Sequence, residues 1–143
     1  MKLSFVVPRM DFSAAGKAST EVKRLLARLG LDQDMVKRIA VSMYEGEMNV
    51  AIHGGGGRAE VEIGRALVVV RFEDQGPGIA DIKLAMTEGW STASEEVRSM
   101  GFGAGMGLPN MKRNADRLEI DSAPGKGTRV RMEFALPDGG NAS

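Results

Sequence analysis

Two polar side chains in the segment YEGEMN, Glu45 and Asn49, stand four residues apart. Apolar residues recur around them at helical spacing, so we expect both on one face of a helix, one turn apart. A carboxylate in this position can act as a general base, and an amide oxygen suits a hard cation such as Mg²⁺. A solvated polar face is the competing interpretation, because polar pairs at this spacing are ordinary on helices.

A second candidate is the segment EDQGPGI, which places Asp74, Gly76 and Gly78 directly after the apolar run VVVRF. An aspartate at the end of a buried strand can turn its carboxylate, a hydrogen-bond acceptor, toward an amine such as that of adenine. Glycines let the backbone pass close to a flat ring. A plain surface turn is the alternative, since Gly, Pro and Asp are also typical turn residues.

A third candidate is a glycine-rich segment ahead of a predicted helix. Backbone N–H groups at a helix N-terminus bind phosphate, and glycines let the phosphate come close. The segment does not follow a strand, as a dinucleotide-binding fingerprint does, and it lacks the Lys-Ser/Thr pair of a P-loop. Neither of these common motifs therefore describes it. Its residues are Gly103, Ala104, Gly105, Met106, Gly107 and Leu108.

The elements that must position these residues follow from hydrophobic periodicity and from turn residues. The predicted order is β-α-α-β-β-loop-α-β-β, which indicates an α/β fold: a two-layer α/β sandwich with a mixed sheet and helices on one face. Strands are expected at 3–7, 59–63, 66–72, 118–122 and 128–136. Helices are expected from Ser13 to Leu29, from Asp32 or Asp34 to His53, and from Gly107 to Asp116, with a short one at 82–86.

Composition narrows the function. The 143 residues fit one domain, expected at 1–136, with residues 137–143 as a disordered tail. The net charge of +0 argues against a nucleic-acid partner, and no apolar stretch is long enough to cross a membrane. The absence of cysteine excludes disulfides and cysteine nucleophiles, so a cytoplasmic protein is the expectation.

Taken together, the three candidates form a specific pattern. Glu-x-x-x-Asn on a helix, Asp-x-Gly-x-Gly after a strand and Gly-x-Gly-x-Gly-Leu at a helix start resemble the Bergerat, or GHKL, ATP-binding fold of gyrase and histidine kinases. The resemblance implies that Asn49 binds Mg²⁺ and that Asp74 binds the adenine amine. It also implies that Gly76, Gly78 and Ile79 form the floor of the adenine site, which Thr128 supports. Residues 103–108 would cover the phosphates.

The finer resemblance is to the anti-sigma-factor serine/threonine kinases, above all to the small switch kinases of the bacterial stressosome. It is carried by YEGEMNVAIHG, by EDQGPGIADIKLAMTEGWST and by GAGMGLPNMKRNADRLEIDSAPGKGT, and it covers about residues 11–134. It implies that ATP phosphorylates a Ser or Thr of a regulatory partner, with Glu45 as the general base. The implied partner is a STAS-domain antagonist or a sigma factor, and relatives dimerise through an edge such as residues 3–7.

Other interpretations stay open at this point. The chain could be a non-catalytic, ATP-gated binding module in which residues 87–102 close over the nucleotide. It could be a detached histidine-kinase catalytic domain, although it has no phosphoacceptor helix pair, or a slow ATPase. It also departs from the sigma-binding kinases, because no arginine precedes its last glycine pair; Arg98 is the candidate substitute.

Overall fold

A computed structural model describes residues 1–9, 16–79, 86 and 107–137. The elements are β1 (Lys2–Val7), α1 (Lys17–Arg28), α2 (Gln33–Ile52), β2 (Gly57–Ile63), β3 (Leu67–Asp74), α5 (Gly107–Asn114), β4 (Arg117–Ser122) and β5 (Thr128–Ala135). This order confirms the one expected from periodicity. Candidate residues 103–106, Arg98 and the short helix expected at 82–86 lie outside the described residues, apart from Met86, which lies in a turn.

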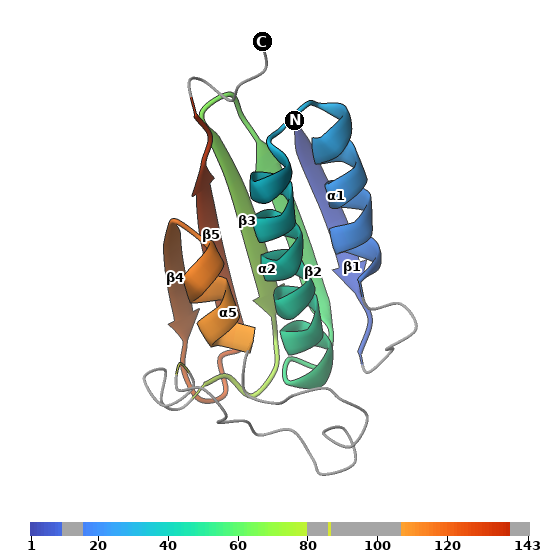
Figure 1. The fold of residues 1–143 in the computed structure, drawn as a ribbon. Coiled ribbons are helices and arrows are strands. Elements are labelled where there is room, and N and C mark those ends of the chain that lie inside the picture. Colours follow the sequence, from blue (N-terminus) through green and yellow to red (C-terminus); the bar gives the residue numbers. More distant parts are fainter. Residues whose placement is uncertain (10–15, 80–85, 87–106, 138–143) are drawn as a thin grey trace.

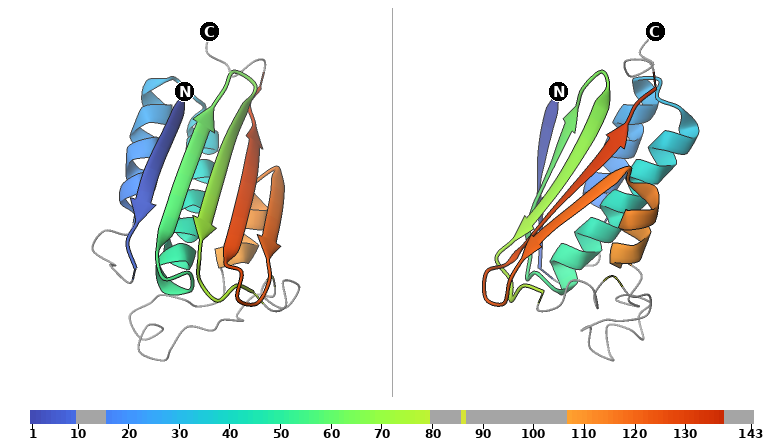
Figure 2. Two further views of the ribbon diagram at one scale, coloured as in Figure 1. Left: turned by 180° about the vertical axis from the view of Figure 1, so that it is seen from behind. Right: turned by 90° about the vertical axis from the view of Figure 1, so that its left-hand side faces the viewer.

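The strands form one sheet in the order β1-β2-β3-β5-β4, and the three helices lie on one face of it (Figure 1, Figure 2). The two-layer sandwich is therefore confirmed. The expectation of a mixed sheet is wrong, because all four strand pairings are antiparallel. Strands β3 and β4 do run in the same direction across the crossover through α5, but β5 lies between them and pairs with both.

The inner face of the sheet follows from alternation along each strand. In β3, Val68, Val70 and Phe72 point toward the helices, and Asp74 continues the same phase. In β5, Thr128 begins the inward row that Met132 and Phe134 continue. The outer face carries charged side chains in ion pairs such as Arg71–Glu62 and Arg129–Glu73. Asp74 and Thr128 are thus polar residues at buried positions.

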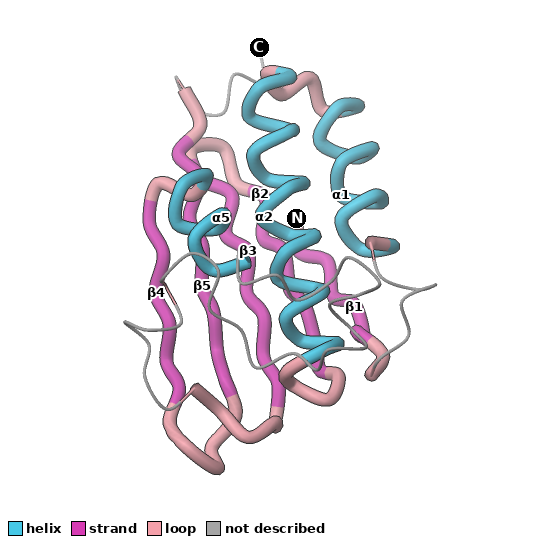
Figure 3. The backbone as a smooth tube through the Cα atoms, turned by 60° about the horizontal axis from the view of Figure 1, so that its bottom comes forward, coloured by secondary structure: helices cyan, strands magenta, loops and turns pink. Residues whose placement is uncertain are grey.

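Helix α2 lies between α1 and α5 and forms the centre of the helical layer (Figure 3). Its start is set by Asp32, whose carboxylate accepts hydrogen bonds from the N–H groups of Asp34 and Met35. Its buried face packs on the sheet around Ile39 and Met43, which are fully enclosed. Among the described residues, no helix is both long and apolar enough to cross a membrane.

Helix α1 begins differently from the sequence-based expectation. Its N-cap is Gly16, so the expectation that the helix begins at Ser13 is wrong. The missing side-chain acceptor comes from α2 instead. The buried carboxylate of Glu47 accepts hydrogen bonds from the N–H groups of Gly16, Ala18 and Ser19, at 3.0, 3.3 and 2.7 Å. A distant carboxylate thus satisfies the open N–H groups that every helix start presents.

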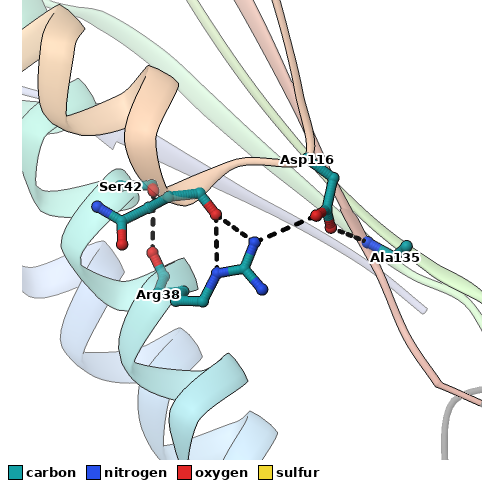
Figure 4. A network of polar contacts seen from close by, with 5 residues as sticks. Arg38, Ser42, Asp116 and Ala135 are labelled. Carbon is teal, nitrogen blue, oxygen red and sulfur yellow. Dashed lines mark hydrogen bonds and ion pairs between the residues drawn. The ribbon is translucent and has the colours of Figure 1, made fainter.

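The C-terminal end of α5 is held by a polar network (Figure 4). Arg38 of α2 donates from Nε to the carbonyl of Asn114, the last residue of α5, at 2.9 Å, and its Nη2 lies 3.3 Å from Asp116 Oδ1. The other carboxylate oxygen of Asp116 accepts the N–H of Ala135 at 2.7 Å. One arginine therefore joins α2, the C-terminus of α5 and the sheet.

Candidate active site at one end of the sheet

The three candidates found in the sequence converge on one end of the molecule. There α2 and β3 end, α5 begins and the turn from β4 to β5 closes, all at the lower end in Figure 1. Glu45 and Asn49 lie on the last turns of α2, Asp74 is the last residue of β3, and Gly107 and Leu108 open α5. Residues far apart in the sequence therefore share one site.

Asp74 is only 6% exposed, yet it faces the helical layer at the open end of the sheet. Its Oδ1 accepts the N–H of Gly76 at 2.9 Å. Burial raises the pKa of this carboxyl above its ordinary value, while the backbone N–H groups of Gly76 and Thr128 and the nearby His53 oppose the shift. The donors of the protein use only part of the hydrogen-bonding capacity of this buried carboxylate. Its remaining lone pairs are suited to accept an N–H of a ligand.

Glycines surround Asp74 because no side chain would fit there. A Cβ on Gly54 would lie 2.4 Å from Asp74 Cγ, and one on Gly76 would lie 2.7 Å from Gly54 Cα. Gly78 and Gly127 have φ of +79° and +73°, and a Cβ on either would lie within 2.2 Å of a backbone oxygen. The backbone at Gly54 and at Gly127 therefore packs directly against Asp74, and a side chain at either position would clash with it.

Thr128 belongs to this site through its hydroxyl. It is 7% exposed and stands opposite Asp74 in the register of β3 and β5. Its Oγ1 lies 2.9 Å from Oγ of Ser122, which also accepts the N–H of Ile79 at 2.7 Å. Ile79 packs against the core, so the structure brings Asp74, Gly76, Gly78, Ile79 and Thr128 together as the sequence predicted.

Glu45 lies beside the start of α5. A Cβ on Gly107 would stand 3.4 Å from its Oε2, in ordinary contact. The carboxylate is half-buried, and this burial raises its pKa, while a hydrogen bond with the Asn110 side chain lowers it. A raised pKa is the expected tuning for a carboxylate that takes up a proton near neutral pH.

Asn49 is half-buried one turn beyond Glu45 on α2. Its backbone carbonyl accepts the N–H of His53 at 2.9 Å, which makes His53 the C-cap of the helix. The described residues contain no cluster of three His, Cys, Asp or Glu side chains that could hold a metal. The amide oxygen of Asn49 fits Mg²⁺, since that ion takes few protein ligands and keeps waters or substrate phosphates.

The two neighbouring carboxylates of α2, Glu45 and Glu47, differ in burial and in side-chain contacts. Glu47 is 2% exposed and fully engaged with the start of α1. Glu45 alone borders the start of α5. Because two residues turn an α-helix by about 200°, Glu47 points away from both Glu45 and Asn49. Leu108 is buried in the core, so only its backbone is available to a ligand.

Three residues that border the candidate site were not identified from the sequence: Ser122, Asn110 and Gly54. Ser122 could have been found from the hairpin, since Ser122 and Thr128 flank a short turn and stand opposite each other. Gly54 could have been read only as part of a flexible glycine turn. No sequence signal pointed to Asn110, because its role depends on how α5 packs on α2.

This chain is similar to known proteins over most of its length. The profile of histidine kinase-, DNA gyrase B- and HSP90-like ATPases matches residues 40–138. The serine/threonine-protein kinase RsbT of Bacillus subtilis (strain 168) is 31% identical over 130 residues, 88% of this chain and 90% of the relative. The anti-sigma F factor of Thermoanaerobacter sp. (strain X514) is 33% identical over 137 residues, 92% of this chain and 90% of the relative.

Among solved structures, the mycobacterial sensor histidine kinase MprB superposes with a TM-score of 0.52 at 17% identity. The match covers 94% of this chain and 97% of the other. At that identity the likeness concerns the fold alone.

Proposed function

Since this chain belongs to the family of histidine kinase-, DNA gyrase B- and HSP90-like ATPases, we propose that it is an ATP-dependent serine/threonine kinase for a regulatory partner protein. Relatives that match nearly the whole chain carry the names serine/threonine-protein kinase and anti-sigma F factor. The observation that carries the proposal is Glu45, a half-buried carboxylate with a raised pKa beside the start of α5. A protein that only bound nucleotide would need no base at that place.

The nucleotide would be held at both ends of the site. Asp74 would accept a hydrogen bond from the adenine amine, with Gly76, Gly78 and Ile79 beneath the ring and Thr128 beside it. The backbone N–H groups at the start of α5, together with residues 103–106, would bind phosphate oxygens. Mg²⁺, held by Asn49, would neutralise charge on the transferring phosphate.

In the transfer step, Glu45 takes the proton of the partner's Ser or Thr hydroxyl. The hydroxyl oxygen forms a bond to the γ-phosphorus, and the bond from that phosphorus to the β,γ-bridging oxygen breaks. The partner leaves as a phosphoester, ADP keeps the bridging oxygen, and Glu45 releases its proton to water. Positioning and electrostatics supply most of the rate in such transfers.

The partner is part of the proposal. The anti-sigma F factors similar to this chain are named for a sigma factor, and a small STAS-domain antagonist is the substrate that we propose.

A cytoplasmic location is proposed as well, because the reaction consumes ATP. A second copy of the chain could add to β1, an edge strand on which Val6 is 74% exposed. Analytical ultracentrifugation measures that assembly directly.

The proposed function is tested by weighing captured partners. Purified protein is immobilised, partners are captured from lysate of the native host, Mg-ATP is added, and each captured protein is weighed by intact mass spectrometry. A partner that gains the mass of one phosphate with the wild type, and not with Glu45→Gln, supports the kinase. A partner that ATP releases or retains without any gain in mass would overturn the kinase in favour of a nucleotide-gated binding module.

A further inference from the structure

The hydroxyl of Ser122 joins the two segments that border Asp74. Its Oγ accepts the N–H of Ile79 at 2.7 Å and donates to the carbonyl of Gly127 at 2.8 Å. Its third neighbour is Thr128 Oγ1, at 2.9 Å. One side chain on β4 therefore ties the segment after β3 to the turn that leads into β5.

The single proton and two lone pairs of the Ser122 hydroxyl decide the direction of its three hydrogen bonds. A serine hydroxyl has one proton and two lone pairs. A carbonyl can only accept, so the proton of Ser122 goes to Gly127, and a backbone N–H can only donate, so Ile79 uses one lone pair. The remaining lone pair must accept, and Thr128 therefore donates its own proton to Ser122. Oγ1 of Thr128 is left with acceptor capacity only.

This direction matters because Thr128 stands opposite Asp74 across β3 and β5, with both side chains on the inner face. Side chains of directly opposed residues are near neighbours. An ionised Asp74 also only accepts. Among the residues that the structure describes here, the site thus presents two neighbouring acceptors and no side-chain hydroxyl donor. At ring position 6 adenine carries an amine donor and guanine a carbonyl acceptor, so a base held with this position toward Asp74 and Thr128 is favoured as adenine and disfavoured as guanine.

We propose that Ser122 is a specificity-determining positioning residue, which sets the direction of the Thr128 hydroxyl so that the site selects a base with an amine, rather than a carbonyl, at the ring position that faces Asp74. This inference rests on the proposed nucleotide-binding function. Without Ser122, the Thr128 proton is free to turn toward a carbonyl, and the N–H of Ile79 loses its acceptor. Selection between the bases then depends on Asp74 alone.

The test is isothermal titration of ADP and GDP into four proteins: wild type, Ser122→Ala, Ser122→Thr and Ser42→Ala. Ser42 of α2 is the matched control, because it is a fully buried serine whose hydroxyl donates to the Arg38 carbonyl at 2.9 Å. Arg38 in turn contacts Asn114, at the end of α5 opposite to the candidate site. We expect Ser122→Ala to lower the ADP-over-GDP preference by about tenfold, the size of one hydrogen bond to a charged or polar partner. Ser122→Thr and Ser42→Ala should keep the wild-type preference.

Thr128→Val keeps the test decisive if Ser122→Ala fails to fold. It removes the acceptor itself and should lower the preference to a similar extent, and combining it with Ser122→Ala should lower it no further. A wild-type preference in either single variant would overturn the role of Ser122. A wild-type protein that binds neither nucleotide would instead sink the proposed function.

Discussion

At the scale of single residues, Asp74 combines a functional position with an energetic cost. Its pKa is raised by burial, so the folded chain holds its proton more tightly than the unfolded chain does. The contribution of Asp74 to stability is therefore full below the ordinary pKa and is lost as pH rises through the raised one. At neutral pH the ionised carboxylate weakens the fold that it serves.

Asp74→Asn should separate these two properties. The amide cannot ionise, so the variant should melt at the same temperature as the wild type or higher at pH 7, and this difference should vanish in acid, where Asp74 is protonated. Affinity for ADP should fall about 10- to 100-fold, because the charged acceptor for the amine is lost. Thermal melts at several pH values and titration calorimetry measure both effects.

The control is Asp121→Asn, since that side chain is 83% exposed and pairs only loosely with Arg129, at 3.7 Å. It should leave ADP affinity unchanged. If Asp74→Asn bound ADP as tightly as the wild type, the adenine site would have to lie elsewhere.

At the scale of elements, Glu47 shows how a carboxylate of one helix completes another. We expect Glu47→Gln to lower the free energy of unfolding by about 1 to 3 kcal/mol, because an amide nitrogen would face N–H donors at the start of α1. Urea denaturation followed by circular dichroism measures this. Glu45→Gln, two residues away and outside this network, is the control and should not destabilise the fold; equal stability of the two variants would refute the capping role.

The second element-scale prediction concerns Arg38, which holds the C-terminus of α5 while the N-terminus of α5 borders Glu45. Arg38→Met keeps the apolar stem and removes the donors. Amides of α5 should then exchange hydrogen several-fold faster, as expected for a loss of about 1 kcal/mol at this partly exposed site. Arg24→Met, an exposed change on α1, serves as the comparison, and protection of α5 that matched the comparison would contradict the account.

Elements were also the part of the structure most open to prediction. The apolar run of β3, the alternation in β5 and the apolar stripe on α2 identify strands and helices, since burial imposes these patterns. The start of α1 could not be predicted because its cap, Glu47, lies on another helix. The expectation of a mixed sheet was wrong because local sequence carries no information that β5 inserts between β3 and β4 and pairs antiparallel with both.

Some residues of the candidate site could likewise be predicted from the sequence, and others could not. Glu45, Asn49 and Asp74 were singled out because their spacing within short segments is itself informative, whereas Thr128 was named only through the family resemblance. Asn110 was not, because only tertiary packing brings α5 against α2.

At the scale of the whole molecule, the site joins both layers, so a nucleotide should stabilise the fold as a unit. A ligand that binds only the folded state at 100 times its Kd stabilises it by about 2.7 kcal/mol. Mg-ADP should therefore raise the melting temperature of the wild type and of Glu45→Gln equally, and raise that of Asp74→Asn by about half as much or less at the same concentration. Differential scanning calorimetry measures the shift, and an equal shift in Asp74→Asn would argue against a site at this end of the sheet.

The central claim is that Glu45 is the base of a phosphotransfer reaction, and a single-turnover transfer rate at saturating Mg-ATP tests it most directly. The wild-type rate should rise with pH through the raised pKa of Glu45, because only the ionised carboxylate can take the hydroxyl proton. Glu45→Gln should keep the ADP affinity, lose about 10²- to 10⁴-fold in rate and lose that pH dependence. A Glu45→Gln protein that transfers phosphate at the wild-type rate, with the wild-type pH profile, would contradict the account.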